Sequence, residues 1–131
     1  MNIQKNISLK PYNTFGIDVK ASHFVNVSSL EKLISALQLP NYPEKFFLGG
    51  GSNMLLTKDL DALVIHLDIK GKKILEKNSE SVTVKISAGE NWHDFVLWCL
   101  ERDFGGVENL SLIPGNVGTA PIQNIGAYGV E

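Results

Sequence analysis

The sequence predicts an α+β fold in which a small βαβ lobe is followed by the start of a second lobe built on an antiparallel sheet. Strand-like and helix-like segments alternate up to residue 69, whereas residues 81–87 alternate strictly between apolar and polar side chains. With 44% apolar residues, the 131-residue chain can form a core. We therefore expect one domain over 1–131, with a first lobe over about 1–69 and part of a second over 70–131.

The first lobe is predicted from three strand-like segments with one helix between the first two. The strands are expected at 23–27, 45–48 and 62–67. Ser28 and Glu31 have the spacing of a capping box, so Ser28 is the expected N-cap of the helix, and Pro40 closes it. The order strand, helix, strand predicts a right-handed βαβ unit with a small parallel sheet.

The second lobe begins after Lys70-Gly71-Lys72, which is typical of a solvated turn. Val82, Val84 and Ile86 share one face of a half-buried strand. A helix should follow, with Asn91 as its N-cap and Gly105 as its end. Its apolar face would be formed by Trp92, Phe95, Val96, Cys99 and Leu100.

Charge and cysteine content narrow the class of protein. Twelve basic and fourteen acidic residues leave a net charge of −2, which argues against a nucleic-acid binder or a binder of anionic membranes. Residues 109–130 carry no charge, but their glycines and prolines exclude a membrane helix. The single cysteine, Cys99, fits a reducing compartment, so we expect a cytoplasmic protein.

The first candidate site is a glycine-rich turn directly after the second predicted strand, Gly49-Gly50-Gly51-Ser52-Asn53. Successive N–H groups in such a turn can form a nest for an anion. Neither the Walker pattern nor the Rossmann pattern of glycines is present. The alternative is a flexible turn that only connects two strands.

The second candidate site is the long segment 110–129, which mixes apolar residues with glycine and proline. This mixture suits an irregular backbone around a large, flat, mostly neutral ligand, with N–H and C=O groups at its edges. The alternative is an ordered loop whose apolar residues only hold it in place. His23, His66 and His93 lack the spacing of metal ligands, so we predict no metal site.

Five motifs in order carry a resemblance to a known family. They are Asn13–Gly16, Gly49–Asn53, Ala88–Trp92, Glu108–Leu110, and the run from Ile113-Pro114-Gly115 to Pro121–Gly129. From about Leu9 to Glu131 the chain resembles the N-terminal, FAD-binding part of the UDP-N-acetylenolpyruvoylglucosamine reductases. The resemblance implies an incomplete FAD-binding domain of the PCMH type (vanillyl-alcohol-oxidase-like), with FAD between two α+β subdomains.

The resemblance also implies which residues meet the cofactor. The turn formed by Gly49, Gly50, Gly51, Ser52 and Asn53 would hold the FAD pyrophosphate. The remainder of the flavin site would be lined by Ile113, Pro114, Gly115, Gly118, Thr119, Ile122 and Gly126. Gln123 and Tyr128 would face the substrate.

The family reaction uses NADPH to reduce the flavin, which then reduces UDP-N-acetylglucosamine enolpyruvate to UDP-N-acetylmuramate for peptidoglycan. The family's catalytic serine, arginine and glutamate lie in segments beyond Glu131, so no catalytic residue is assigned here and the chain by itself is expected to be inactive. Part of the Val82, Val84 and Ile86 face would be uncovered, which favours self-association. The alternatives are another PCMH-type oxidoreductase and a non-catalytic binding module.

Overall fold

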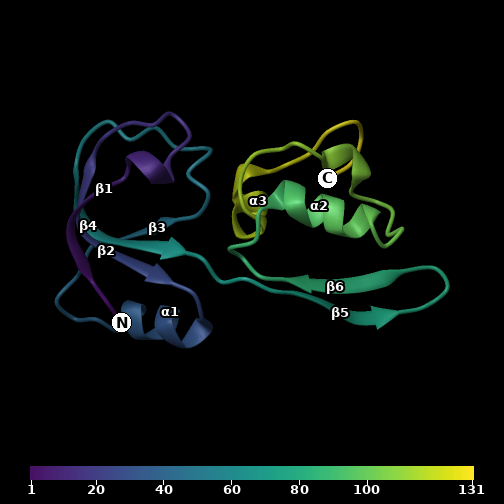
Figure 1. Ribbon diagram of the computed structural model, residues 1–131, viewed down its shortest axis with the longest axis horizontal. Coiled ribbons are helices and arrows are strands. Elements are labelled where there is room, and N and C mark those ends of the chain that lie inside the picture. The colour runs from purple at the N-terminus through teal and green to yellow at the C-terminus, as the bar shows by residue number, and fades with distance from the viewer. The chain divides into compact units, whose positions relative to one another are not determined.

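The computed structural model describes all 131 residues, which divide into two compact units, Met1–Ile69 and Lys70–Glu131 (Figure 1). The division falls where the character of the sequence changes. Each unit has its own sheet and its own apolar core. The mixed α and β content agrees with the predicted α+β class.

The first unit is built on a four-stranded sheet in the order β1-β2-β4-β3. Its strands are β1 (Gln4–Ser8), β2 (Lys20–Val27), β3 (Lys45–Leu48) and β4 (Leu60–Leu67). β4 pairs in parallel with both β2 and β3, so the predicted parallel sheet is confirmed, with β4 inserted between the two strands that the helix connects. The antiparallel edge strand β1, followed by a short 3-10 helix at Lys10–Tyr12, was not predicted.

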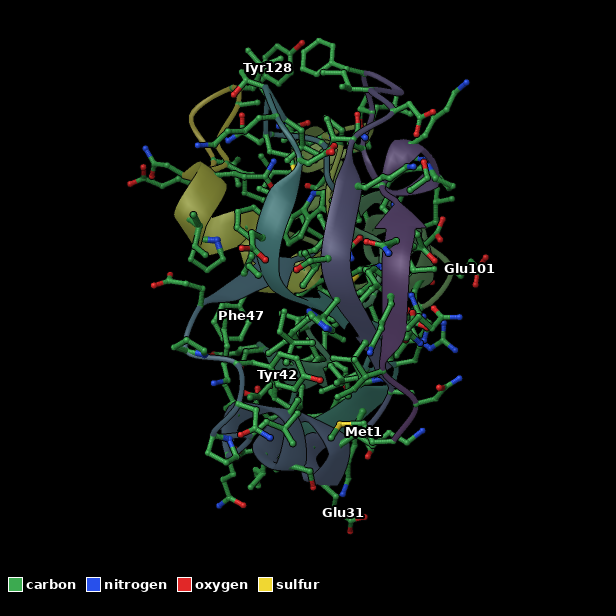
Figure 2. All side chains as sticks on the ribbon, turned by 90° about the vertical axis from the view of Figure 1, so that its left-hand side faces the viewer. Met1, Glu31, Tyr42, Phe47, Glu101 and Tyr128 are labelled. Carbon is green, nitrogen blue, oxygen red and sulfur yellow. The ribbon has the colours of Figure 1, made fainter.

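The helix α1 (Leu30–Leu37) begins one residue later than predicted. Ser29, not Ser28, is the N-cap, because its extended backbone lets its Oγ accept the Lys32 N–H at 3.2 Å. The Ser28 hydroxyl lies outside the helix and accepts from the Lys32 Nζ. Only Ala36 is fully buried, while Glu31 projects outward from the helix (Figure 2).

The core of the first unit covers both faces of its sheet. On β2, Phe24 belongs to one apolar cluster and Val25 to the other, and Val64 and Ile65 divide in the same way on β4. The helix α1 contributes Ala36 to the cluster that contains Val25. The cluster that contains Phe24 is completed by Leu9 and Leu56, which lie in loops. Burial on both faces is typical of parallel strands and makes this sheet a rigid base for the loops that leave it.

The second unit combines a hairpin with one main helix. The hairpin is formed by β5 (Lys72–Lys77) and β6 (Val82–Ile86), and the helix is α2 (Trp92–Leu100). Two 3-10 turns, Glu108–Leu110 and Val117–Thr119, and the short helix α3 (Ala120–Gln123) follow. β6 and its half-buried face were predicted, but β5 was not. Val84 and Ile86 pack against the core formed by α2.

The helix α2 begins as predicted and ends earlier. The Asn91 Oδ1 caps it by accepting the Asp94 N–H at 3.0 Å. The predicted end at Gly105 is wrong, because Asp103 takes the left-handed conformation with φ of 56°. The Phe104 N–H then donates to the Cys99 carbonyl at 2.9 Å, which closes the helix with a Schellman motif before Gly105 is reached.

None of the three α-helices combines the length and the apolar character that crossing a membrane would require.

Candidate cofactor-binding loops

The glycine-rich turn after β3 is held against the N-terminal part of its own unit. Gly51 is buried with φ of 67°, and its carbonyl accepts the Thr14 N–H at 3.0 Å. A Cβ at Gly51 would lie only 1.9 Å from the Tyr12 carbonyl oxygen. Glycine is therefore required at this position by a close approach within the protein itself.

The main-chain N–H groups of this turn take little part in the hydrogen bonding of the fold. No hydrogen bond outside the helices and strands uses the N–H of Gly50, Gly51 or Asn53 as its donor. Gly50 and Asn53 are exposed. The N–H groups of Gly50 and Asn53 are therefore left for another acceptor, as expected of an anion-binding nest, whereas Gly51 is buried.

A buried amide fixes the segment that supports Gly51. Asn13 donates from Nδ2 to the carbonyls of Leu9 at 2.8 Å and Ile17 at 3.0 Å, and its Oδ1 accepts the Ile17 N–H at 3.0 Å. These bonds use three of the four hydrogen-bonding positions of the amide. In the sequence, Asn13 was notable only as part of a family motif, and the structure shows that it fixes the turn behind the glycine-rich loop.

The start of the second candidate segment is bound to residues 88–92 by main-chain hydrogen bonds. They run from Trp92 N–H to Gly115 O at 2.9 Å, from Val117 N–H to Glu90 O at 2.8 Å and from Gly118 N–H to Ala88 O at 3.0 Å. A Cβ at Gly118 would lie 2.6 Å from the Ala88 Cβ. The N–H groups of Val117 and Gly118 are thus already used, and Gly118 is required for packing against Ala88.

The hydrogen bonds between residues 88–92 and 115–118 form a clamp, and a buried carboxylate, Glu90, connects this clamp to the turn before β5. Glu90 accepts the Gly71 N–H at 2.8 Å and the Lys72 Nζ at 3.0 Å, while the Lys70 Nζ donates to the Gly89 carbonyl. Burial acts to raise the pKa of Glu90, but these donors and the two lysine charges outweigh burial and hold the pKa below its usual value. The prediction of a solvated turn therefore holds for the exposed Lys70 and is wrong for Lys72, whose side chain is only 24% exposed and pairs with Glu90.

Two of the predicted contact residues are hydrogen-bonded to each other. The Thr119 Oγ1 lies 2.8 Å from the Gln123 Oε1 and 3.0 Å from the Asn116 carbonyl, so its single proton goes to one of these two oxygens. The Thr119 hydroxyl thus lies within hydrogen-bonding distance of the side chain of Gln123, the last residue of α3. Asn124 then adopts φ of 50° and ends the helix.

The apolar residues of the second segment divide into two groups. Ile113, Val117 and Ile125 pack on the core of the unit. In contrast, Leu112, Ile122 and Tyr128 are 78%, 84% and 87% exposed (Tyr128 in Figure 2). The segment is thus fixed by one set of apolar side chains and offers another set to solvent.

The remaining predicted residues of this segment lie in differing surroundings. Gly115 is buried with φ of 112°, and the preceding Pro114 is exposed. Gly126 lines a hollow of about 390 Å³ formed by the turn at the end of the chain. A Cβ at Gly126 would approach the Val130 carbonyl oxygen to 3.2 Å. This turn is closed by reciprocal hydrogen bonds between the main chains of Ala127 and Val130.

The histidines serve as hydrogen-bonding groups of the fold. The His93 Nδ1 accepts the Leu112 N–H at 3.0 Å, and the His66 Nδ1 lies 2.6 Å from the Asn26 Oδ1. The ring of His23 packs edge-to-face with the ring of Tyr42. No group of three histidine, cysteine, aspartate or glutamate residues is placed to hold a metal ion. The bond of His93 to the second segment could not be found from the sequence, because nothing in it pairs residue 93 with residue 112.

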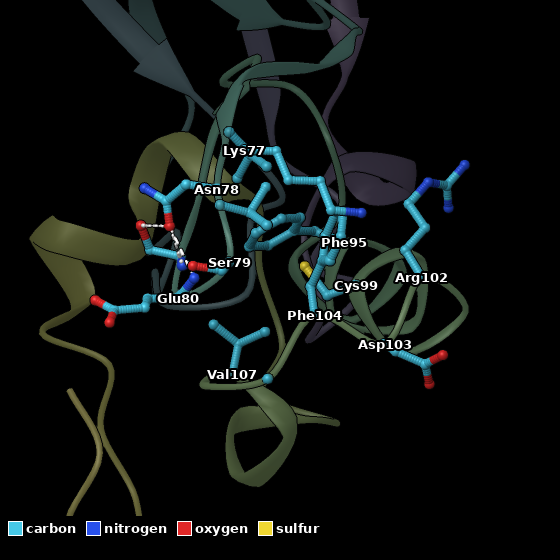
Figure 3. Close-up of a pocket in the computed structure, with 14 residues that line it drawn as sticks. Lys77, Asn78, Ser79, Glu80, Phe95, Cys99, Arg102, Asp103, Phe104 and Val107 are labelled. Carbon is cyan, nitrogen blue, oxygen red and sulfur yellow. Dashed lines mark hydrogen bonds between the residues drawn. The ribbon is translucent and has the colours of Figure 1, made fainter.

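A further pocket lies elsewhere, between the β5–β6 hairpin and the end of α2 (Figure 3). It encloses about 530 Å³, and none of the predicted cofactor residues lines it. Its apolar wall includes Phe95, Cys99 and Phe104, with Lys77 and Arg102 at its rim. Burial raises the pKa of the Cys99 thiol, so this thiol is not an activated nucleophile. The pocket contains no constellation that could perform chemistry.

Comparison with known proteins shows the family to which the chain belongs. Residues 21–131 match the family described as FAD binding domain, and the chain belongs to this family. The family membership confirms the predicted fold class, and FAD is the cofactor that this family binds.

Particular relatives confirm the resemblance drawn from the motifs. The chain is 62% identical over its whole length to UDP-N-acetylenolpyruvoylglucosamine reductase of Flavobacterium johnsoniae, and 53% identical over 98% of its length to that of Pseudomonas putida. It spans only 39% and 38% of those two proteins. The crystal structure of the corresponding reductase from Thermus caldophilus matches 99% of the chain, and 45% of its own length, with a TM-score of 0.75 and 27% identity.

Proposed function

We propose that this chain forms the FAD-binding part of a reductase that uses NADPH to convert UDP-N-acetylglucosamine enolpyruvate into UDP-N-acetylmuramate in peptidoglycan synthesis. The observation that carries the proposal is the pair of braced loops in a chain of the FAD-binding family. The partners of the whole protein would be small molecules, NADPH and a nucleotide sugar. The proposal places the enzyme in the cytoplasm, which the single buried Cys99 favours.

The glycine-rich turn fits the pyrophosphate of FAD. The N–H groups of Gly50 and Asn53 have no acceptor in the fold and would be available to phosphate oxygens, and the Thr14 N–H holds the turn through the Gly51 carbonyl. No lysine or arginine lies within the turn. Main-chain dipoles would therefore supply the attraction for the phosphates, together with the side chains of Ser52 and Asn53.

The second segment fits the ring system of FAD. Ile122 offers an exposed apolar side chain, while Thr119 and Gln123 place polar atoms beside it. Apolar faces with a few oriented polar groups are what a flat aromatic ligand requires. Gln123 and Tyr128 are the residues we assign to the substrate side.

FAD, when bound, supplies the hydride chemistry that no amino-acid side chain can perform. The contribution of this chain is to bind and orient the cofactor and to keep water from its faces. No acid or base in either loop is placed to transfer a proton, so we assign no catalytic residue within residues 1–131. Proton transfer would fall to segments that the longer relatives contain.

The proposal is tested by the retention of FAD in a protein of the relatives' full length that carries this chain. Gly50→Val should abolish retention, because a β-branched side chain would occupy the space in front of the N–H groups. Gly105→Val, at an exposed glycine outside both loops, is the matched control and should retain flavin. The measurement is flavin absorbance after desalting, together with substrate-dependent oxidation of NADPH. Normal flavin content in Gly50→Val would overturn the assignment of the turn, and a flavin-loaded wild-type protein that ignores the nucleotide sugar would overturn the proposed reaction.

A further inference from the structure

We propose that Leu112 is an additional contact residue for the flavin ring and that His93 is the positioning residue that holds it in place. Neither residue is among those that the motifs assign to the cofactor. The inference rests on the proposed function, because it extends the same FAD site by one contact and one support.

The first observation is the backbone conformation of Leu112. Its φ is 63°, in the left-handed region that residues with a branched side chain rarely adopt. Leucine gains nothing from a local side-chain hydrogen bond there, as asparagine or aspartate would. A conformation of this kind persists only where the surroundings impose it, and it is found preferentially at functional sites.

The second observation is what this conformation does to the side chain. Leu110 is buried in the core and Ile113 packs against it, whereas Leu112 between them is 78% exposed. The turn at Leu112 thus directs a large apolar side chain into solvent in a segment whose neighbours face inward. Exposing this side chain to water costs free energy in the unbound protein, and that free energy is recovered if a ligand covers the side chain.

The third observation is the bond that holds the turn. The Leu112 N–H donates to the His93 Nδ1 at 3.0 Å, so this nitrogen must be unprotonated and the proton of the neutral ring lies on Nε2. His93 is the second residue of α2, whose start is fixed by the Asn91 cap. The orientation of Leu112 is thereby tied to a helix that belongs to the core of the unit.

These observations point to one role. Leu112 directly precedes Ile113-Pro114-Gly115, the stretch assigned to the flavin. An aliphatic side chain held at this point would cover part of one face of a flat aromatic ring and exclude water from it. Because the side chain is held before binding, the ligand does not have to order it.

The test compares variants in a protein of the relatives' full length that carries this chain. Leu112→Ala removes the contact but keeps the N–H, and should weaken FAD binding roughly tenfold. His93→Leu removes the acceptor and should weaken binding roughly as much, whereas His93→Asn keeps an acceptor near the Nδ1 position and should restore most of the affinity. Leu75→Ala, at an exposed leucine of β5, is the matched control and should bind FAD as the wild type does.

A second readout does not depend on flavin. In the protein without FAD, hydrogen exchange at the Leu112 amide should accelerate at least tenfold in His93→Leu and stay near the wild-type rate in His93→Asn. Thermal unfolding identifies any variant that fails to fold. Leu112→Ala keeps the His93 bond and therefore carries the test of the contact even if His93→Leu does not fold.

The outcomes separate the two proposals. Wild-type protein that binds FAD, with unchanged affinity in Leu112→Ala and His93→Leu, overturns this inference and leaves the proposed function standing. Wild-type protein that binds no FAD overturns both. Unchanged exchange at the Leu112 amide in His93→Leu overturns the positioning role of His93, whatever the flavin result.

Discussion

The two candidate loops offer opposite chemistry to a ligand, although both are held by hydrogen bonds to other residues of their own unit. The glycine-rich turn of the first unit presents main-chain N–H groups, and its support comes from behind through Asn13 and Thr14. The second segment uses the N–H groups of Val117 and Gly118 internally and presents apolar side chains instead. The first loop therefore suits a charged phosphate group, and the second suits the face of an apolar ring.

In both loops, a glycine is required by contact with the protein's own chain. Gly51 lies against Tyr12 and Gly118 lies against Ala88. A glycine in a binding loop therefore need not be the glycine that touches the ligand. The comparison is tested most directly by adding a Cβ at Gly51 and at Gly118 in separate variants and measuring stability and FAD binding in each.

The largest effect is expected from Gly51→Ala. The new Cβ would lie 1.9 Å from the Tyr12 carbonyl oxygen at a residue with φ of 67°. We expect a loss of about 3–5 kcal/mol in the free energy of unfolding and complete loss of bound FAD. Urea unfolding and flavin absorbance measure the two effects.

Gly16→Ala is the matched control for this variant. Gly16 has nearly the same φ, 65°, but nothing lies within 4 Å of the position of its Cβ. Its cost should be only about 1 kcal/mol, which is the cost of the backbone conformation alone. Equal losses in the two variants would show that the close approach to Tyr12 contributes nothing.

A smaller effect is expected from Gly118→Ala in the second segment. Its Cβ would meet the Ala88 Cβ at 2.6 Å, so the hydrogen bonds between residues 88–92 and 115–118 should be strained or lost. We expect a loss of about 2–3 kcal/mol in stability and weaker binding of FAD. The measurements are those used for Gly51→Ala.

The reverse change at the partner residue sharpens this test. Ala88→Gly removes the Cβ that Gly118→Ala would meet, so the double variant should recover at least about 1 kcal/mol relative to Gly118→Ala. The recovery stays partial, because the Ala88 Cα and carbonyl oxygen also lie within 3.0 Å of the new Cβ. If the double variant loses as much stability as the sum of the losses in the two single variants, the two residues do not compete for space.

The fold class and the position of both loops could be predicted, because they depend on patterns that are local in the sequence. The alternation in β6 and the Asn91 cap are examples, and in both the predicted boundary lies within one residue of the observed one. The strands β1 and β5 were missed for a physical reason. β1 is a mostly polar edge strand, and β5 is interrupted by an irregularity between Ile74 and Glu76, so neither shows a clean alternation.

The supports of the loops could not be predicted, because each joins residues far apart in the chain. Tyr12 and Gly51, Ala88 and Gly118, and His93 and Leu112 are examples. The sequence shows that a glycine or histidine is present, but not which main chain lies against it. The prediction of where α2 ends was wrong for another reason. An aspartate, Asp103, occupies the left-handed position for which glycine was expected.

The smallest expected effect tests the ionic part of the clamp. The pKa of Glu90 is lowered in the folded protein, so its bonds to the Gly71 N–H and Lys72 stabilise the fold while the carboxylate is charged. This contribution is complete above the ordinary pKa of 4.5 and is lost as the pH falls through the lower folded value. Glu90→Gln should cost about 1 kcal/mol at pH 7 and progressively less as the pH falls through the lowered pKa of Glu90, where the wild-type side chain becomes neutral as well. Urea unfolding from pH 7 down to about pH 2 gives the difference between the two proteins. A difference that stays constant over this range would show that the charge of Glu90 does not hold the second segment, and the clamp would then depend on its main-chain hydrogen bonds alone.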